Sequence, residues 1–168
     1  MKINECIKIY KAAFGSSEPF DTILFESFGD FLHTVKQNEK IVSMLFTLPC
    51  ELNFEDKKKK LYYVYAAATD KEYRGKGYMS AFIKELAKGS DAPLFLKPAT
   101  ESLQSFYAKL GFKKINATTE KCGASIEVSE KHKRLSELCD SRHENYILMI
   151  YGDLTPEISE LSFRHTLD

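Results

Sequence analysis

The sequence has no excess of charge of either sign, which bears on its partners. Lysine plus arginine number 24, as do aspartate plus glutamate, so the formal net charge at pH 7 is zero. Proteins that bind nucleic acid or an acidic membrane surface usually carry a basic surplus. We therefore expect neither nucleic acid nor a membrane among the partners of this chain.

The sequence also has no long apolar run. None approaches the ~20 residues that a membrane-spanning helix needs, and the first residues show no signal-peptide pattern. Apolar residues make up 43% of the chain and charged residues 29%, which are ordinary values for a globular protein. We expect one cytoplasmic domain over residues 1–168, with a core of its own and a loosely held tail from about residue 153.

The cysteines form no known pattern. The four are Cys6, Cys50, Cys122 and Cys139. They include no Cys-x-x-Cys pair, and a disulfide framework is not expected in a chain with this much apolar sequence and no export signal. A zinc site built from His132, Cys139 and His143, with or without Cys122, would match no common spacing of zinc ligands. We therefore expect no metal, and a polar helix and loop in this region.

The feature around which the chain is organised is the stretch of residues 65–86. An apolar run at residues 61–68 leads into a short polar turn, and a helical pattern with one apolar face follows, ending at Gly89. The turn holds Arg74, Gly75, Lys76 and Gly77, and the apolar face holds Tyr78, Met79, Phe82, Ile83 and Leu86. Such a turn presents backbone N–H groups at the positive end of a helix dipole, which suits a phosphate or pyrophosphate.

Two common phosphate-binding motifs are absent from this turn. The sequence contains no Gly-x-x-x-x-Gly-Lys-Ser/Thr loop. Gly75-Lys76-Gly77 is followed by Ser80 where a dinucleotide fingerprint has its third glycine. A nucleotide-binding domain is therefore a weak alternative, which titration with ATP or NAD would test.

Periodicity and turn signals predict further elements on both sides of this stretch. The predicted helices are residues 3–14, 17–28, 78–88, 101–110 and 129–140, and the predicted strands are residues 31–36, 41–48, 61–68, 94–97, 112–115 and 145–151. The stripes expected to face the core are Ile3, Ile7, Tyr10 and Phe14 in the first helix, and Phe20, Ile23, Leu24 and Phe28 in the second. Pro49 should interrupt its strand at an edge or a bulge. Residues 53–60, which end in four lysines, should form a hairpin tip, and the lysines should be solvated rather than form a phosphate-binding patch.

The turn resembles a family motif. Arg74-Gly75-Lys76-Gly77-Tyr78-Met79 is similar to the Arg/Gln-x-x-Gly-x-Gly/Ala acetyl-coenzyme A signature of the GNAT superfamily of N-acetyltransferases. Residues 100–112 resemble a later helix of that family, which ends in Phe-Tyr-x-Lys-Leu-Gly-Phe. Met79 departs from the signature, since the family has glycine or alanine there, and its bulk would narrow the cofactor groove. The resemblance is strongest over residues 41–112.

The resemblance implies a fold and a cosubstrate. The fold is an α/β (α+β) domain with a mixed, mostly antiparallel sheet, helices on both faces, and a splayed parallel strand pair at the cofactor site. The cosubstrate is acetyl-coenzyme A, whose pantetheine arm would enter the splay beside a bulged strand at residues 61–68. The implied cofactor-binding residues are Ala67, Ala68, Thr69, Arg74, Gly75, Lys76, Gly77, Tyr78, Met79 and Thr100. The three alanines at residues 66–68 would leave room for the pantetheine arm; the alternative is that they are small because a helix packs tightly over them.

The resemblance also implies a catalytic residue. Tyr107 stands at the family's tyrosine position and is the candidate acid that protonates the departing thiolate. Its spacing fits equally well a structural role as the inward aromatic of a helix, in line with Leu103, Phe106 and Leu110. Thr100 is expected to be the N-cap of that helix.

The general base cannot be chosen from the sequence. Glu26, Glu51 and Asp70 are carboxylates on plausible walls of the site, and a water relay through one of several tyrosines is another possibility. The family places the first two helices beside the acceptor, so Glu26 or Phe28 could contact it, although solvation of the glutamate and core packing of the aromatic ring are favoured.

The predicted function is transfer of an acetyl group from acetyl-coenzyme A to a primary amine, by direct attack in a ternary complex without a metal. A small-molecule amine is favoured over a peptide acceptor, and the oligomeric state, including a homodimer, stays open. The alternative from another class is a non-catalytic module that binds or senses an acyl-coenzyme A. Turnover with a panel of amines, as opposed to binding alone, would separate the two.

Overall fold

The computed structural model describes residues 3–16, 18–54, 57–116, 124–136, 147–152 and 163–165. Contacts divide the chain into two compact units. The first unit consists of Met1–Leu48 and Val64–Lys88, and the second of Pro49–Tyr63 and Gly89–Asp168. Two long strands, β2 (Lys40–Phe54) and β3 (Lys57–Thr69), each contribute residues to both units.

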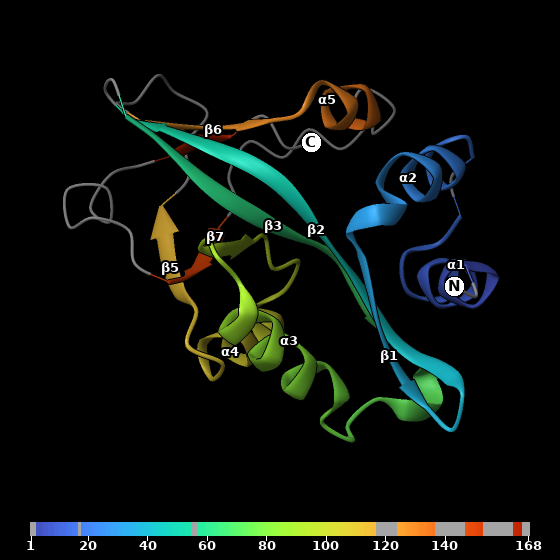
Figure 1. Ribbon diagram of the computed structural model, residues 1–168. Helices are drawn as coiled ribbons and strands as arrows, with labels where there is room; N and C mark the ends of the chain where they lie inside the picture. The colour runs from blue at the N-terminus through green and yellow to red at the C-terminus, as the bar shows by residue number, and fades with distance from the viewer. Residues whose placement is uncertain are drawn as a thin grey trace. The chain divides into compact units, whose positions relative to one another are not determined.

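The strands form a mixed sheet with hydrogen-bonded order β5-β7-β4-β3-β2-β6-β8, and β1 also pairs with β2 (Figure 1). The remaining strands are β1 (Leu32–Gln37), β4 (Leu94–Leu96), β5 (Lys113–Asn116), β6 (Ala124–Val128), β7 (Ile147–Tyr151) and β8 (Phe163–His165). The pairs β1/β2, β2/β6, β4/β7 and β5/β7 are antiparallel, whereas β3/β4 and β6/β8 are parallel. The predicted α/β class with a mostly antiparallel sheet is confirmed.

Within the described residues, the helices match the predicted ones in number and order. They are α1 (Ile3–Phe14), α2 (Phe20–Phe28), α3 (Tyr78–Gly89), α4 (Glu101–Ala108) and α5 (Glu130–Ser136), with the 3-10 turns η1 (Gly29–Phe31) and η2 (Lys71–Tyr73). In the first unit, α1 and α2 lie on one side of the β2 and β3 ribbons, and α3 lies on the other (Figure 1). None of the helices in the described ranges combines the length and apolar content needed to span a membrane.

Aromatic contacts fasten α1 and α2 to the sheet of the first unit. The ring of Phe25 on α2 meets Tyr10 on α1 edge-on at 5.7 Å between centroids and meets Phe46 on β2 at 5.4 Å. The Glu5 side chain on α1 accepts a hydrogen bond from the Ile41 backbone N–H at 2.9 Å. Because Phe25 and Phe46 are buried, these contacts remove apolar area from water and form the centre of this core.

The predicted core stripe of α1 is wrong. The expected stripe was Ile3, Ile7, Tyr10 and Phe14, but the buried residues are Cys6, Ile9 and Tyr10. Phe14 is 53% exposed and contacts Tyr10 at 5.1 Å. Two overlapping stripes of helical spacing share Tyr10, and the one that includes Cys6 and Ile9 faces the core.

The prediction that Pro49 interrupts its strand is also wrong, because β2 continues through it to Phe54. The pairing of β2 with β1 extends to Phe46, and the pairing with β6 begins at Cys50. Pro49 falls between the two registers, where its missing N–H removes no bond to either strand. Of the hairpin tip predicted at residues 53–60, residues 53 and 54 end β2 and the four lysines at residues 57–60 begin β3, while residues 55 and 56 lie outside the described residues.

In the second unit, the parallel pair β3/β4 is built around stacked rings. Tyr63 and Phe95 stack at 4.8 Å between centroids with an interplanar angle of 14°. Residues Leu94, Phe95 and Leu96 of β4 are all buried, since β3 and β7 flank this strand. Strand β6 was not predicted, because a loop was expected over residues 116–125; yet Ala124, Ile126 and Val128 alternate with polar residues as in a strand.

Several predictions fall partly outside the described residues. The predicted helix at residues 129–140 is described as α5 up to Ser136. Of the tail expected to be loosely held, only β8 lies within the described ranges beyond Gly152, where it pairs with β6. Cys122, Cys139 and His143 of the rejected zinc site lie outside the described residues.

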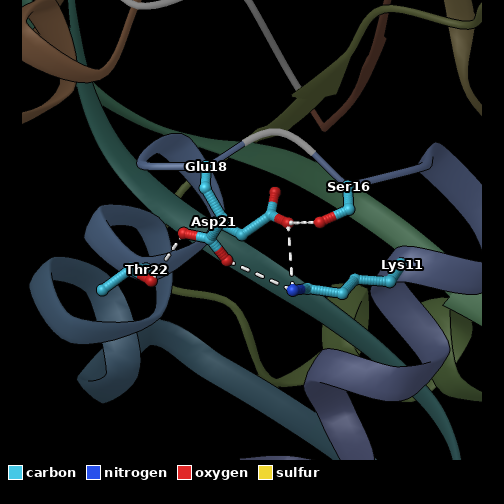
Figure 2. A network of polar contacts seen from close by, with 5 residues as sticks. All are labelled: Lys11, Ser16, Glu18, Asp21 and Thr22. Atoms are coloured by element: carbon cyan, nitrogen blue, oxygen red, sulfur yellow. Dashed lines mark hydrogen bonds and ion pairs between the residues drawn. The ribbon is translucent and has the colours of Figure 1, made fainter.

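The α1–α2 junction is held by a polar network (Figure 2). Asp21, in the first turn of α2, is 2% exposed, and its Oδ2 accepts a hydrogen bond from Ser16 Oγ at 3.0 Å. The Lys11 ammonium lies 3.7 Å from the same carboxylate and 3.2 Å from Glu18, whose other oxygen accepts from Thr22 at 2.8 Å. Lys11 therefore forms ion pairs with two carboxylates at the start of α2.

Candidate functional site

The turn between β3 and α3 has the backbone that a bound phosphate requires. Gly75 and Gly77 have φ angles of 74° and 84°, in the left-handed region that glycine occupies without strain. A Cβ built at either position would meet nothing within 4 Å. The space that a side chain would occupy at both glycines is therefore free of other protein atoms.

This turn also supplies hydrogen-bond donors. Helix α3 begins with the Ala81 N–H donating to the Gly77 carbonyl at 3.0 Å. Within the described ranges, the N–H groups of Tyr78, Met79 and Ser80, the first residues of α3, donate to no protein acceptor. These donors point out of the helix start, at the positive end of its dipole, where an anion is stabilised.

Two basic side chains of the turn have no acidic partner among the described residues. Arg74 and Lys76 are both exposed, and neither forms an ion pair there. The Arg74 Nε donates to the Thr69 carbonyl at 3.0 Å, which ties the turn to the end of β3. Because both side chains keep their charge uncompensated, they can neutralise a polyanion that approaches the turn.

The end of β3 is distorted where the sequence predicts a bulge. Ala66 has a φ of 51°, which takes the strand out of extended geometry between Tyr65 and Ala67. The recorded pairing of β3 with β4 is limited to Tyr62↔Leu94 and Tyr63↔Phe95. Backbone groups of β3 beyond Tyr63 are thus not committed to a β4 ladder.

Contacts to β2 fix the last residues of β3. The hydroxyls of Thr69 and Ser43 lie 2.9 Å apart, and the Asp70 N–H donates to the Val42 carbonyl at 2.9 Å. Ala68 is buried, whereas Ala67 and Thr69 are half-buried. The structure therefore brings together the predicted residues 67–69 and 74–79 in the first unit, joined by the bond between Arg74 and Thr69.

The other two predicted residues, Thr100 and Tyr107, belong to the second unit, on α4. The Thr100 hydroxyl accepts from the Leu103 N–H at 3.2 Å, so the predicted N-cap is present. Leu103 is 38% exposed, which contradicts its predicted place in the buried stripe. Of the predicted stripe only Tyr107 is buried, since Phe106 and Leu110 are half-buried and Leu110 lies beyond the end of α4 at Ala108.

Tyr107 is the buried ring of α4. It is 7% exposed and lies between Phe106 at 5.1 Å and Phe112 at 5.6 Å. Burial raises the pKa of its phenol to about 12, because an ionised oxygen would lose its hydration there. The Tyr107 hydroxyl consequently keeps its proton at any working pH and can act as a hydrogen-bond donor.

The candidate bases differ in their surroundings. Asp70 caps η2 by accepting from the Glu72 N–H at 3.1 Å; this bond and the Lys40 ammonium lower the pKa of its carboxyl. A lowered pKa makes Asp70 a weaker base. Glu51 pairs with Lys58 at 2.7 Å, and Glu26 is exposed on α2. No base is assigned on these grounds.

The two described cysteines are poor nucleophiles. Burial raises the pKa of the Cys6 thiol to about 11 and that of Cys50 to about 12. Neither thiol is therefore ionised near neutral pH. In the described part of the chain, no cluster of three or more histidine, cysteine, aspartate or glutamate residues could hold a metal ion.

Comparison with known proteins decides the family. A family model described as an acetyltransferase (GNAT) domain matches residues 1–115, well over half of the chain. The chain belongs to the GNAT family of acetyltransferases. No protein of curated function matches it in sequence.

Solved structures of GNAT proteins share the fold. A GCN5-related N-acetyltransferase from Anabaena variabilis is 22% identical, with a TM-score of 0.59 over 69% of this chain and 30% of its own. A Corynebacterium glutamicum protein described as histone acetyltransferase HPA2 and related acetyltransferase is 13% identical, with a TM-score of 0.58 over 93% of this chain and 94% of its own. The Bacillus subtilis N-acetyltransferase YlbP, solved in complex with coenzyme A, is 13% identical, with a TM-score of 0.51 over 89% of this chain and 90% of its own.

These likenesses establish the GNAT fold, with one difference of length. The chain spans about a third of the length of the first structures that it matches. The part of the chain beyond residue 115 lies outside the family model. Strand β6 and helix α5 fall in that part.

Proposed function

We propose that this GNAT domain is an N-acetyltransferase that moves an acetyl group from acetyl-coenzyme A to the primary amine of a small molecule. The observation that carries the proposal is the turn at residues 74–79. Its two left-handed glycines, its uncommitted N–H groups and its unpaired Arg74 and Lys76 fit a diphosphate. Acetyl-coenzyme A contains such a diphosphate and supplies the acetyl thioester.

The residues of the first unit would bind and orient the cosubstrate. N–H groups of residues 75–80 would donate to the diphosphate oxygens, and Arg74 and Lys76 would neutralise their charge. Backbone groups of Ala67, Ala68 and Thr69, which are not committed to β4, are available for an extended amide chain such as pantetheine. An N–H near Ala67 or Ala68 would stabilise negative charge on the thioester oxygen during attack.

For Tyr107 we propose a donor role toward the departing thiolate. Support comes from its place in the family motif and from its burial, which keeps the phenol protonated. The ordinary pKa of a thiol is about 8.5, so a phenol with a pKa of about 12 stabilises the thiolate by hydrogen bonding rather than by complete proton transfer. The amine must be neutral when it attacks, and the group that takes its proton is unassigned.

The test is a screen of amines with detection of thiol release. Small amines, amino acids and a lysine-containing peptide would each be incubated with acetyl-coenzyme A and the full chain. Amine-dependent thiol release with mass-spectrometric identification of the acetylated amine supports the proposal. Tight calorimetric binding of acetyl-coenzyme A without turnover on any amine would instead indicate a sensing module. Binding of ATP or NAD but not of coenzyme A would overturn the assignment of the turn.

A further inference from the structure

A cluster of side chains next to the turn is not explained by the function proposed above. The β1–β2 hairpin turns at Asn38 and Glu39, whose φ angles are 47° and 62°. This tight turn places Gln37 and Lys40 at the tip of the hairpin, paired directly in the β-ladder. Both contact the segment that leads from β3 into α3.

Lys40 makes three contacts with that segment. Its ammonium lies 3.1 Å from Asp70 and 3.6 Å from Glu72, and it sits 4.9 Å from the centroid of the Tyr73 ring. The hydrogen bond to Asp70 raises the pKa of Lys40, and the neighbouring charges act in the same direction. Its charge is therefore compensated by two carboxylates, in contrast to that of Lys76.

Tyr73 and Tyr78 connect the hairpin tip to the turn itself. The Lys76 ammonium lies 5.0 Å from the centroid of the same Tyr73 ring. The rings of Tyr73 and Tyr78 meet edge-on at 6.0 Å, and the Tyr78 hydroxyl donates to Gln37 Oε1. Contacts thus run from the hairpin through two aromatic rings to the lysine and the first helical residue of the turn.

We propose that this tyrosine–lysine cluster, made up of Gln37, Lys40, Tyr73, Lys76 and Tyr78, holds the turn at residues 74–79 in the conformation that binds the diphosphate of coenzyme A. The inference rests on the proposed function. Lys40 and Tyr73 are positioning residues, since they act through Lys76 and Tyr78.

The physical reason is the conformational entropy that the turn and the Lys76 side chain lose when a ligand binds. Residues 74–77 are exposed, and two of the four are glycines, so little packing restricts them. A ligand that had to order such a turn and the long Lys76 side chain would lose part of its binding free energy. Contacts that order both before binding remove that loss. The Tyr73 ring attracts the Lys76 ammonium without neutralising it, so the cation stays available to phosphate.

Two substitutions test the proposal. Lys40→Met removes the ion pairs and one cation–π contact, and Tyr73→Leu removes the ring that both lysines share. Each should weaken calorimetric binding of coenzyme A by about 3- to 10-fold. Each should raise KM for acetyl-coenzyme A to a similar extent while leaving kcat unchanged. Lys40→Arg and Tyr73→Phe, which keep the charge and the ring, should retain wild-type affinity.

The chain offers a matched control in Lys60. Its ammonium lies 4.7 Å from the Tyr62 ring centroid and 2.9 Å from Asp91, and the Lys60 side chain is 52% exposed against 46% for Lys40. Lys60→Met therefore removes the same kinds of contact in the second unit, and coenzyme A affinity should not change. Circular dichroism and melting curves verify that each variant is folded. If Lys40→Met does not fold, Tyr78→Phe, which removes one oxygen, should still weaken binding.

The double variant Lys40→Met/Tyr73→Leu separates positioning from direct contact. If the cluster acts as one unit, the affinity of the double variant for coenzyme A equals that of whichever single variant binds coenzyme A less tightly. Additive losses would mean that Lys40 and Tyr73 act independently, which overturns the proposal of a single cluster, as would wild-type affinity in both folded single variants. Failure of the wild-type protein to bind coenzyme A is a different result, because it overturns the proposed function.

Discussion

Gly77 is the residue at which the coenzyme A assignment can be tested most directly. Its φ of 84° is left-handed, and a Cβ there would enter open space. We expect Gly77→Asp to weaken acetyl-coenzyme A binding by at least about 100-fold, since its carboxylate would oppose the charge of the diphosphate. Isothermal calorimetry on folded protein measures the loss.

The strain of an aspartate at positive φ needs its own control. Gly15 has a φ of 86° and equally open surroundings, at the end of α1. Gly15→Asp should therefore cost the same roughly 1–2 kcal/mol of stability as Gly77→Asp. It should bind acetyl-coenzyme A like the wild type. Wild-type affinity in folded Gly77→Asp would show that the turn does not carry the phosphates.

Tyr107→Phe tests whether the buried hydroxyl takes part in the reaction. The ring contacts with Phe106 and Phe112 should persist, so α4 stays packed. Turnover should fall toward the lower end of the about 10²–10⁴-fold range of acid catalysis, with little change in cofactor affinity. Tyr151→Phe, in the ring that neighbours Phe112 at 5.5 Å, is the matched control and should keep full activity.

The pH profile gives a second measurement on the same variant. Because burial raises the pKa of Tyr107 to about 12, its ionisation cannot shape the rate between about pH 6 and pH 10. Wild type and Tyr107→Phe should therefore show profiles of the same shape at different heights. Full turnover with a lowered melting temperature would assign Tyr107 a purely structural role.

The junction of α1 and α2 allows a comparison of how much a buried and an exposed carboxylate contribute to the free energy of unfolding. Lys11 contacts Asp21, whose side chain is 3% exposed, and Glu18, whose side chain is 54% exposed. We expect Asp21→Asn to lower the free energy of unfolding by about 1–3 kcal/mol, because it leaves buried polar groups badly matched. Glu18→Gln makes the same change of charge at the surface and should cost less, because solvent screens an exposed ion pair.

Urea denaturation of both variants at neutral pH measures the two costs. A larger loss in Asp21→Asn than in Glu18→Gln is required by the difference in burial. Equal losses would mean that the Lys11 pairs are solvated alike in solution, and that the network in Figure 2 does not secure the start of α2.

At the scale of elements, the sequence predicts what depends on neighbouring residues and misses what depends on distant ones. The turn and helix α3 were predictable because their glycines, charges and apolar positions are contiguous. The continuation of β2 through Pro49 was not, since it depends on where β1 ends and β6 begins. The buried face of α1 likewise depends on the position of Phe25 in α2.

The same limit applies to the site. Residues 67–69 and 74–79 follow from a motif, whereas Lys40 and Tyr73 are 33 positions apart and meet only in the folded chain. The signal that could have suggested the contact is the Gln-Asn-Glu-Lys turn at residues 37–40, which predicts a tight hairpin tip. No local pattern says which segment such a tip will contact.

At the scale of the whole molecule, the reactivity of two buried thiols can be used to follow the unfolding of the two units separately. Cys6 lies in the first unit and Cys50 in the second, and the raised pKa of each makes both unreactive in the native state. Because β2 and β3 each run through both units without a linker, we expect the units to unfold together.

Pulsed alkylation across a urea titration would measure this in a variant with Cys122→Ser and Cys139→Ser. Mass spectrometry of the digested protein gives the fraction labelled at each remaining cysteine. A single cooperative domain predicts that Cys6 and Cys50 become reactive at the same urea midpoint, and that this midpoint matches the loss of circular dichroism. Coenzyme A should raise both midpoints together, since a ligand bound to the native state stabilises every part that unfolds with it. Labelling of Cys50 at lower urea than Cys6, or a shift of Cys6 alone with coenzyme A, would contradict this expectation, because the unit that carries the turn would then unfold independently of the one that carries Tyr107.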